Sequence, residues 1–388
     1  MAEKVEYLTP SFKFTPARAS PGLYISVTPD KMKNAATLKL DPDYVAIDTT
    51  YRCNLACAFC FMAKSSRRKP TGKELPLAVW KKFIDTLSSR RREFYIAGGE
   101  PGIRKDLPEL VAYIKKGGHR CLVNTNGCSL DIKTAGKLLE AGLDEIAVSF
   151  HGTPELHDRI VGRKGAFAKT AAVCAAINSS PLKGVKHLTF WCAINAANHD
   201  RLYSVYKALR ALGPDHIAFN QLDFIREKDR KKTAALFKNS LGSGLNLRTS
   251  ESMSDGISVP KLAAETARIK AEKDPSIRFD LDLTEKEMKL WYDPKTGFTK
   301  QGFCLGQWNS VWVGPNGDMV SCQPLGHVMG NITQGDWLKT YNGPAYRKFR
   351  ELLIKQGGFL PTCSRCGRTS YTSAHLESPG AARTLKKG

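Results

Sequence analysis

From about residue 44 onward, the sequence alternates short runs rich in β-branched and aromatic residues with longer segments whose apolar residues recur at helical spacing. This alternation is typical of a parallel sheet covered by helices. We place the strands at residues 44–50, 93–99, 120–126, 145–152, 187–195 and 216–224. Six strands with intervening helices predict an α/β fold in the form of a partial (β/α)6 barrel.

The same pattern divides the chain into five segments. These are an N-terminal extension (1–43) with a strand candidate GLYISVTP, the partial barrel (44–235), a linker or insertion containing a helix (236–300), a compact unit rich in Gly, Trp and Cys (301–370), and a basic, disordered tail (371–388). The stretch after Phe224 is basic and then rich in Ser and Gly, which predicts a loop or insertion around the substrate opening.

Length and composition narrow the class of protein. A chain of 388 residues with 42% hydrophobic content can bury one large core and a smaller appendage. The sequence contains no apolar stretch of membrane-spanning length and no signal-peptide core, so we expect a cytoplasmic protein without a membrane span. The net charge of +22 favours anionic partners, but its short basic runs fit solvated faces as well as a nucleic-acid surface.

The 11 cysteines carry most of the chemical information. An odd number without a secretion signal argues against a disulfide framework and for ligands or buried thiols. Four of them stand singly in or beside apolar runs and are interpreted as core residues: Cys121, Cys128, Cys174 and Cys192. The other seven fall into two spaced groups.

The first group, Cys53, Cys57 and Cys60, has the spacing C-x3-C-x2-C and directly follows the first predicted strand. Thiolates suit both zinc and iron-sulfur centres, but a structural zinc site needs a fourth ligand, and the nearest following histidine is His119. A cubane cluster held by three cysteines instead keeps one iron open for a substrate or cofactor. At the end of a barrel strand, such a loop lies where α/β folds build their active sites.

This loop, with the aromatic Phe59 before its last cysteine, resembles the cluster-binding loop of the radical S-adenosylmethionine (SAM) superfamily. Further motifs follow in that family's order. The resemblance implies that Gly98, Gly99 and Glu100 of AGGEP bind the methionyl amine of SAM, and that Asn126 of NTNG and Ser149 present polar groups to it. Arg163 would pair with the SAM carboxylate, and Asn195 would meet the ribose or adenine. Turn-forming or internally satisfied side chains are the alternative for these positions.

The second cysteine group lies near the C-terminus and comprises Cys304, Cys322, Cys363 and Cys366. Two short strands joined by the turn PNG precede Cys322, and the last pair forms a CxxC. By composition alone a structural zinc ribbon remains open. The motifs GxxxxC, GNI and CxxC, however, resemble the C-terminal SPASM or Twitch appendage of radical SAM enzymes, a β-hairpin plus helix unit. No cysteine follows Cys366, which favours the shorter Twitch form with one auxiliary 4Fe-4S cluster.

The resemblance implies that the reduced first cluster cleaves SAM to a 5'-deoxyadenosyl radical that abstracts hydrogen from an unactivated C–H bond, with the auxiliary cluster in electron transfer. The substrate class stays open between a small molecule, a lipid-like molecule and a peptide, and flavodoxin or ferredoxin would supply electrons. The sequence identifies no catalytic acid or base, and Cys192 and Tyr95 are the candidate hydrogen donors. The alternatives are modification of an RNA, which no recognisable RNA-binding module supports, and a non-catalytic zinc scaffold.

Overall fold

The computed structural model describes residues 35–37, 40–60, 73–87, 90–183, 187–245, 247, 255–293, 303–304, 306–367 and 373–374. The strand candidate GLYISVTP and most of the tail 371–388 lie outside the described residues. Within that tail, Ser373–Ala374 forms the short strand β12, which pairs antiparallel with β8 (Phe303–Cys304).

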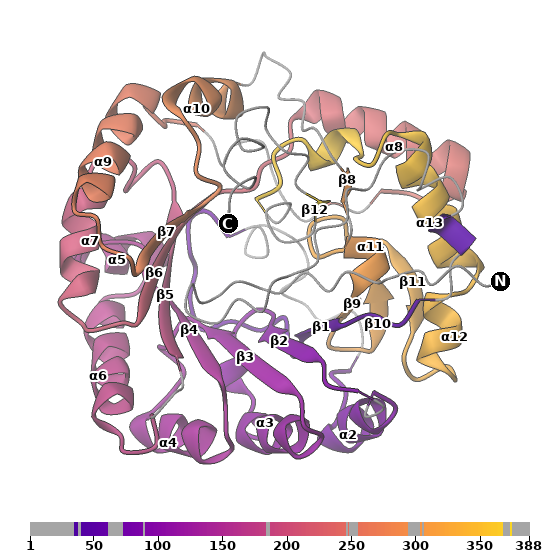
Figure 1. Ribbon diagram of the computed structural model, residues 1–388, viewed down its shortest axis with the longest axis horizontal. Coiled ribbons are helices and arrows are strands. Elements are labelled where there is room, and N and C mark those ends of the chain that lie inside the picture. Colours follow the sequence, from indigo (N-terminus) through magenta and orange to yellow (C-terminus); the bar gives the residue numbers. More distant parts are fainter. Residues whose placement is uncertain are drawn as a thin grey trace, which may run out of the picture.

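A curved sheet of ten strands forms the centre of the molecule (Figure 1). Seven strands are parallel and pair in chain order. They are β1 (Tyr44–Asp48), β2 (Glu93–Ala97), β3 (Arg120–Thr125), β4 (Glu145–Ser149), β5 (His187–Ile194), β6 (His216–Gln221) and β7 (Ile277–Asp280). The six predicted strands are confirmed. The sequence did not predict β7, which extends the barrel into the segment assigned to a linker.

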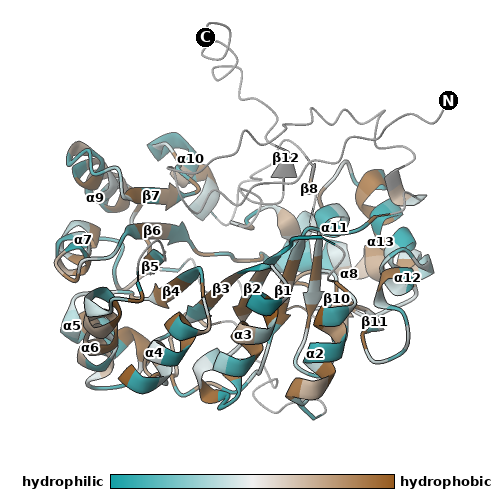
Figure 2. Ribbon diagram, turned by 60° about the horizontal axis from the view of Figure 1, so that its bottom comes forward, coloured by the Kyte–Doolittle hydropathy of each residue, from teal (hydrophilic) through white to brown (hydrophobic). Residues whose placement is uncertain are grey.

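Helices cover the outer, convex face of this sheet (Figure 1). They are α2 (Leu77–Asp85), α3 (Leu107–Lys116), α4 (Ile132–Glu140), α5 (Pro154–Val161), α6 (Ala166–Ser179), α7 (Leu202–Arg210) and α9 (Val259–Ala271). In α3 the buried residues Leu107, Leu110, Val111 and Ile114 follow the i, i+3, i+4, i+7 spacing of one helix face. Figure 2 shows such helices with an apolar and a polar side. Burying these apolar sides against the strands closes the core.

The segment after Phe224 differs from the prediction of a loop. Residues Glu227–Leu241 form helix α8, which contacts the short helix η6 (Pro361–Cys363). The helix is polar and buries only Asp229, Thr233 and Phe237, so its apolar periodicity is too weak to reveal it in the sequence. The hydroxyl of Thr233 accepts a hydrogen bond from the backbone N–H of Thr362 (3.2 Å). This contact ties α8 to the CxxC segment.

The C-terminal unit continues the barrel sheet. Strands β9 (Ser310–Val313) and β10 (Asp318–Val320) form the predicted hairpin, and β11 (Val328–Asn331) pairs antiparallel with β10. The turn residue Gly317 has φ +88°, a conformation that favours glycine. Unexpectedly, β9 pairs in parallel with β1, so the hairpin and the barrel share one sheet.

The remaining elements are η2 (Ala35–Thr37), η4 (Pro101–Ile103), α10 (Glu285–Tyr292), α11 (Gly306–Asn309), α12 (Trp337–Tyr341) and α13 (Pro344–Lys355). In the described part of the chain, every helix falls short of the length and apolarity needed to span a membrane.

Candidate functional site

The first cysteine loop lies at the carboxyl end of β1. Backbone hydrogen bonds fix it to the last turn of α5. The N–H of Ala56 donates to the carbonyl of Val161 (3.0 Å), and the N–H of Ala58 donates to the carbonyl of Ile160 (3.0 Å). The three cysteines of the loop are partly exposed and line one cavity: Cys53, Cys57 and Cys60. The loop therefore presents its thiols inward from a fixed backbone.

The two glycines of the GGE motif let the end of β2 pack closely against the start of this loop. A Cβ at Gly98, which has φ +130°, would lie 2.3 Å from the carbonyl oxygen of Thr50. A Cβ at Gly99 would lie 2.2 Å from the carbonyl oxygen of Arg52. The sequence predicted these glycines for close approach to a ligand. They line the cavity as expected, and the structure adds that backbone packing alone requires glycine there.

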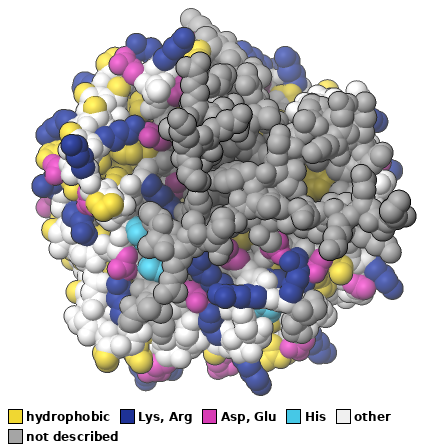
Figure 3. All heavy atoms as spheres, in the orientation of Figure 1, with side chains coloured by type: hydrophobic (Ala, Val, Ile, Leu, Met, Phe, Trp, Pro, Cys, Tyr) yellow, Lys and Arg dark blue, Asp and Glu magenta, His cyan; other side chains and the backbone are white. Residues whose placement is uncertain are grey.

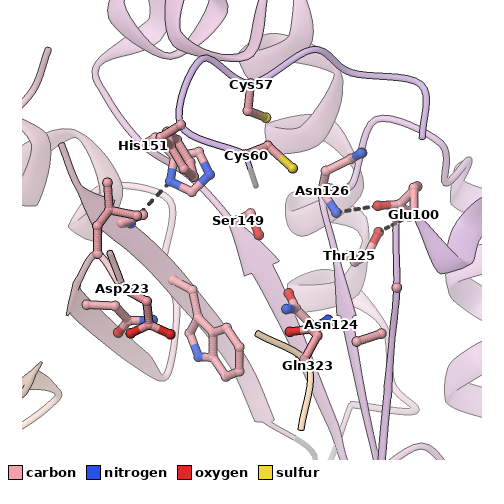
Figure 4. Close-up of a pocket in the computed structure, with 18 of the residues that line it drawn as sticks. Cys57, Cys60, Glu100, Asn124, Thr125, Asn126, Ser149, His151, Asp223 and Gln323 are labelled. Carbon is pink, nitrogen blue, oxygen red and sulfur yellow. Dashed lines mark hydrogen bonds between the residues drawn. The ribbon is translucent and has the colours of Figure 1, made fainter. Parts of the chain in front are cut away.

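Glu100 lies at the cavity wall beside Thr125 and Asn126 (Figure 4), and its carboxylate accepts four hydrogen bonds. Oε1 accepts from the hydroxyls of Thr125 (2.5 Å) and Ser129 (2.6 Å) and from the backbone N–H of Gly102 (2.9 Å). Oε2 accepts from the backbone N–H of Asn126 (2.7 Å). Burial raises the pKa of Glu100, and these donors limit the rise by favouring the carboxylate. Glu100 thus holds the ends of β2 and β3 together.

Asn126, at the end of β3, connects this network to the cysteine loop. Its side-chain amide donates to Asn54 Oδ1 (2.8 Å) and lies 3.7 Å from Cys53 Sγ, while its Oδ1 accepts from the backbone N–H of Cys128 (2.9 Å). An amide N–H directed at a thiolate stabilises the charged sulfur. Asn126 is therefore placed to orient the first cysteine of the group.

Ser149 and His151 come from the end of β4. Ser149 lines the cavity, and its contact with SAM stays a prediction. His151 also lines it, close to the cysteine loop (Figure 4). Its Nδ1 accepts a hydrogen bond from the backbone N–H of Ala193 (3.2 Å), and burial lowers the pKa of His151 to about 3. The ring is therefore neutral at physiological pH.

Two predicted SAM contacts lie elsewhere among the described residues. Arg163 is exposed beyond the end of α5 and does not line the cavity. The side chain of Asn195 closes a turn, donating to the carbonyl of Ala193 (2.9 Å) and accepting from the backbone N–H of Ala197 (2.9 Å). Of the two candidate hydrogen donors, Tyr95 lines the cavity, whereas Cys192 is fully buried outside it.

The four C-terminal cysteines lie near one another. Burial and the nearby thiols of Cys304, Cys322 and Cys366 raise the pKa of Cys363 well above its usual range. Among the described residues, no three Cys, His, Asp or Glu side chains have the spacing of ligands to a single metal ion. Thiolates are ligands of both zinc and iron-sulfur centres, so the chemistry of these four side chains suits either.

The cavity, of about 350 Å³, lies between the two cysteine groups. At its far end it reaches Gln323 and Gly367, which are the immediate neighbours of Cys322 and Cys366. Asp223, which accepts the backbone N–H of Gly367, lies there as well (Figure 4).

Aromatic rings from the barrel interior form one wall of this cavity. Tyr95 stacks between Tyr44 and Trp191, with ring centroids 6.2 and 6.1 Å apart, and Trp312 of β9 meets Tyr95 edge-on. These residues face inward because alternate side chains of each strand point to the concave side of the sheet. Apart from Tyr95, none of these rings was predicted, since an inward aromatic residue in a strand has the same sequence pattern as an outward core residue.

The charge of the protein is spread over its surface. In Figure 3, Lys and Arg side chains are scattered over the visible face and mixed with Asp and Glu. The described residues that line the cavity include Glu100, Asp223 and Asp280 but no Lys or Arg. The charged side chains among these lining residues are therefore acidic.

Comparisons with known proteins agree with this geometry. The sequence pattern of the Radical SAM superfamily matches residues 47–191, and that of the SPASM iron-sulfur cluster-binding domain matches residues 304–367. A Fe-coproporphyrin III synthase of Methanosarcina barkeri (strain Fusaro / DSM 804) is 42% identical over 32% of this chain, and the match spans only 31% of that protein. A PqqA peptide cyclase of Ruegeria pomeroyi is 27% identical over 85% of this chain and 80% of that protein.

Among solved structures, Streptococcus suis SuiB bound to S-adenosylmethionine superposes with a TM-score of 0.57. The match covers 83% of this chain and 70% of SuiB at 14% identity, so it shows a shared fold.

Proposed function

Because the chain belongs to the radical SAM superfamily and carries a SPASM iron-sulfur cluster-binding domain, we propose that its central cavity is where SAM and a substrate meet. The chain is an enzyme, and its cofactors are a 4Fe-4S cluster, an auxiliary iron-sulfur cluster and SAM. When bound, these groups supply an electron to SAM and generate a 5'-deoxyadenosyl radical that abstracts hydrogen from a substrate C–H bond.

In this proposal Cys53, Cys57 and Cys60 hold the first cluster. The observation that carries it is that all three thiols open into one cavity from a loop fixed to α5. Asn126 orients Cys53, and the close-packed glycines of the GGE motif leave backbone groups at the wall for the methionyl part of SAM. The aromatic wall, whose rings are buried or partly buried, shields the reacting atoms from water.

Cys304, Cys322, Cys363 and Cys366 would hold the auxiliary cluster. Its neighbours Gln323 and Gly367 line the same cavity, which supports a role in accepting an electron from the substrate. Once a hydrogen atom had passed from the substrate to the 5'-deoxyadenosyl radical, giving 5'-deoxyadenosine, the substrate radical would lose one electron to this cluster and one proton, which makes the net reaction an oxidation of the substrate. An external donor such as flavodoxin or ferredoxin would start the cycle.

For the substrate we favour a peptide, one side chain of which enters the cavity. The relative that aligns over most of the chain is named a PqqA peptide cyclase, and the stacked rings around Tyr95 suit an apolar or aromatic side chain. A small-molecule or lipid-like substrate is the competing outcome.

The test is anaerobic reconstitution with iron and sulfide, followed by reduction and addition of SAM. Wild-type protein should release 5'-deoxyadenosine, and Cys57→Ala should lose both this product and the iron of the first cluster. Cys128→Ala is the matched control, because this thiol is buried and lies outside the cavity. A Cys57→Ala protein with unchanged iron content and visible absorbance would contradict the proposal.

A further inference from the structure

Three hydrogen bonds fix the position of His151. Its ring Nδ1 accepts the backbone N–H of Ala193 (3.2 Å), and its own backbone N–H donates to Nδ1 of His157 (3.1 Å). Its carbonyl accepts from the side chain of Asn198 (2.9 Å), which is fully buried. Three partners from different segments therefore fix both the backbone and the ring.

The bond from Ala193 also decides where the ring proton lies. A backbone N–H can only donate, so Nδ1 of His151 must be the unprotonated nitrogen. A neutral imidazole carries one proton, which leaves it on Nε2. His151 therefore has a single N–H donor, and its position is fixed by the main chain of β5.

This donor is directed into the cavity beside the cysteine loop. His151 lines the cavity, and its ring meets the edge of Phe59 with centroids 4.8 Å apart. Phe59 immediately precedes Cys60, and Figure 4 shows the ring in the same part of the cavity as Cys57 and Cys60. Among the described residues, Nε2 of His151 has no hydrogen-bond partner and is not sealed from the cavity.

Two nearby histidines differ from His151 in the surroundings of Nε2. Nε2 of His157 and Nε2 of His199 are both completely buried and meet no partner among the described atoms. Neither residue lines the cavity. Of these three histidines, only His151 offers its N–H to a bound group.

We propose that His151 is a positioning residue of the first cluster, and that its Nε2–H donates a hydrogen bond to a cluster sulfur. This inference rests on the proposed function, because it requires the cluster on Cys53, Cys57 and Cys60. A hydrogen bond to sulfur stabilises the reduced cluster, which carries more negative charge, and so raises its reduction potential. His151 would make the cluster easier to reduce before SAM is cleaved.

Two substitutions distinguish the Nε2–H donor of His151 from the structural role of its Nδ1, which accepts the N–H of Ala193. In His151→Asn the side-chain oxygen can still accept the N–H of Ala193, but the donor at the Nε2 position is lost. In His151→Gln an amide N–H can occupy the Nε2 position and restore the donor. His199→Asn is the control, because His199 is equally buried and lies outside the cavity.

The measurement is a redox titration of the full-length, cluster-loaded protein without SAM, followed by electron paramagnetic resonance. In a parallel sample that contains SAM, the resonance signal that SAM changes is assigned to the first cluster. His151→Asn should lower its reduction equilibrium constant about three- to tenfold, roughly 30–60 mV for a one-electron couple, with His151→Gln closer to wild type. In wild-type protein exchanged into deuterium oxide, pulsed electron paramagnetic resonance should detect a deuteron that is magnetically coupled to this cluster.

An unchanged potential in a well-loaded His151→Asn protein, or no coupled deuteron in the wild type, would overturn the inference. Weaker SAM binding at an unchanged SAM-free potential would also overturn it and assign the donor to SAM instead. Failure of the wild-type protein to assemble the first cluster would count against the proposed function itself, so the two failures are distinguishable.

Discussion

Oε2 of Glu100 accepts the backbone N–H of Asn126 at 2.7 Å, and this bond joins the ends of two neighbouring strands beneath the cysteine loop. The side chain of Asn126 in turn contacts Cys53, so Glu100 helps to fix the position of the first thiol of the group. The carboxylate therefore stabilises the geometry of the site through Asn126.

Glu100→Ala should destabilise the protein and weaken loading of the first cluster. The substitution leaves four donors without their buried acceptor, and each loss costs about 1–3 kcal/mol before relaxation. We expect a total loss of at least about 3 kcal/mol in urea unfolding of the metal-free protein, together with lower iron content. Glu140→Gln, on the exposed side of α4, should stay within about 0.5 kcal/mol of wild type. A stable Glu100→Ala protein with full iron content would show that the network is dispensable.

Gly99→Ala should displace the cysteine loop. Its Cβ would meet the carbonyl oxygen of Arg52 at 2.2 Å, a backbone atom that cannot rotate away. We expect a loss of about 1–3 kcal/mol or more, with reduced iron loading. Gly136→Ala makes the same chemical change in the interior of α4, where nothing lies within 4 Å, and should stabilise by about 0.5–1 kcal/mol. Equal effects of the two substitutions would contradict this account.

Cys322→Ser should disable the auxiliary centre and leave the first cluster active. Loss of one auxiliary ligand should remove about half of the bound iron if each centre is a 4Fe-4S cluster. Release of 5'-deoxyadenosine from reduced protein should persist, because the first cysteine loop is intact, whereas substrate oxidation should stop. Iron analysis and product chromatography on the same sample check both parts. Zinc in place of iron at this centre would favour the zinc-ribbon alternative.

Glu145 should make the stability of the metal-free protein depend on pH. Burial raises the pKa of Glu145 to about 7, although Thr189 donates to it (2.7 Å) and Arg120 lies 3.7 Å away. The folded state therefore binds this proton more tightly than the unfolded state, whose pKa is near 4.5. The free energy of unfolding should fall as pH rises from about 4.5 to 7, by as much as about 3 kcal/mol at 1.36 kcal/mol per pH unit.

The control for this prediction is a second glutamate. Glu145→Gln should remove the share of this decline that belongs to Glu145 and leave that of Glu93, whose pKa burial also raises to about 7. Glu109→Gln, exposed on α3, should retain the whole decline. Urea titrations at pH 5, 6, 7 and 8 provide the measurement. A pH dependence that is the same in wild type and Glu145→Gln would assign the titration to another group.

The sequence predicted the strands well at their starts and less well at their ends. Each predicted strand begins at the observed residue, but β4 and β6 end at Ser149 and Gln221, each three residues before its predicted end. The excess residues, among them His151 and Asp223, turn into the cavity instead of continuing the ladder. Residue preference alone does not show where a strand leaves the sheet, because the same types of residue continue past that point.

The local motifs predicted residues that line the cavity, and the roles of these residues in binding SAM and a cluster stay predictions. The cysteine loop, Gly98, Gly99, Glu100, Asn126 and Ser149 all line one cavity, since each lies at or beyond the carboxyl end of a barrel strand. Arg163 lies two residues beyond α5, and the side chain of Asn195, directly after β5, closes a turn; spacing does not specify how these turns fold. The donor geometry of His151 depends on β5 pairing with β4, a contact between segments far apart in the sequence.

The parallel pairing of Tyr44 in β1 with Ser310 in β9 has a consequence for the placement of the two cysteine groups. The strand that leads into the first cysteine loop is hydrogen-bonded directly to the hairpin that leads into Cys322. The backbone segments that lead into the two cysteine groups thus belong to one continuous ladder, which holds the two groups in a fixed relative position. Deleting the C-terminal unit would also strip β1 of a partner and leave a bare strand edge prone to aggregation.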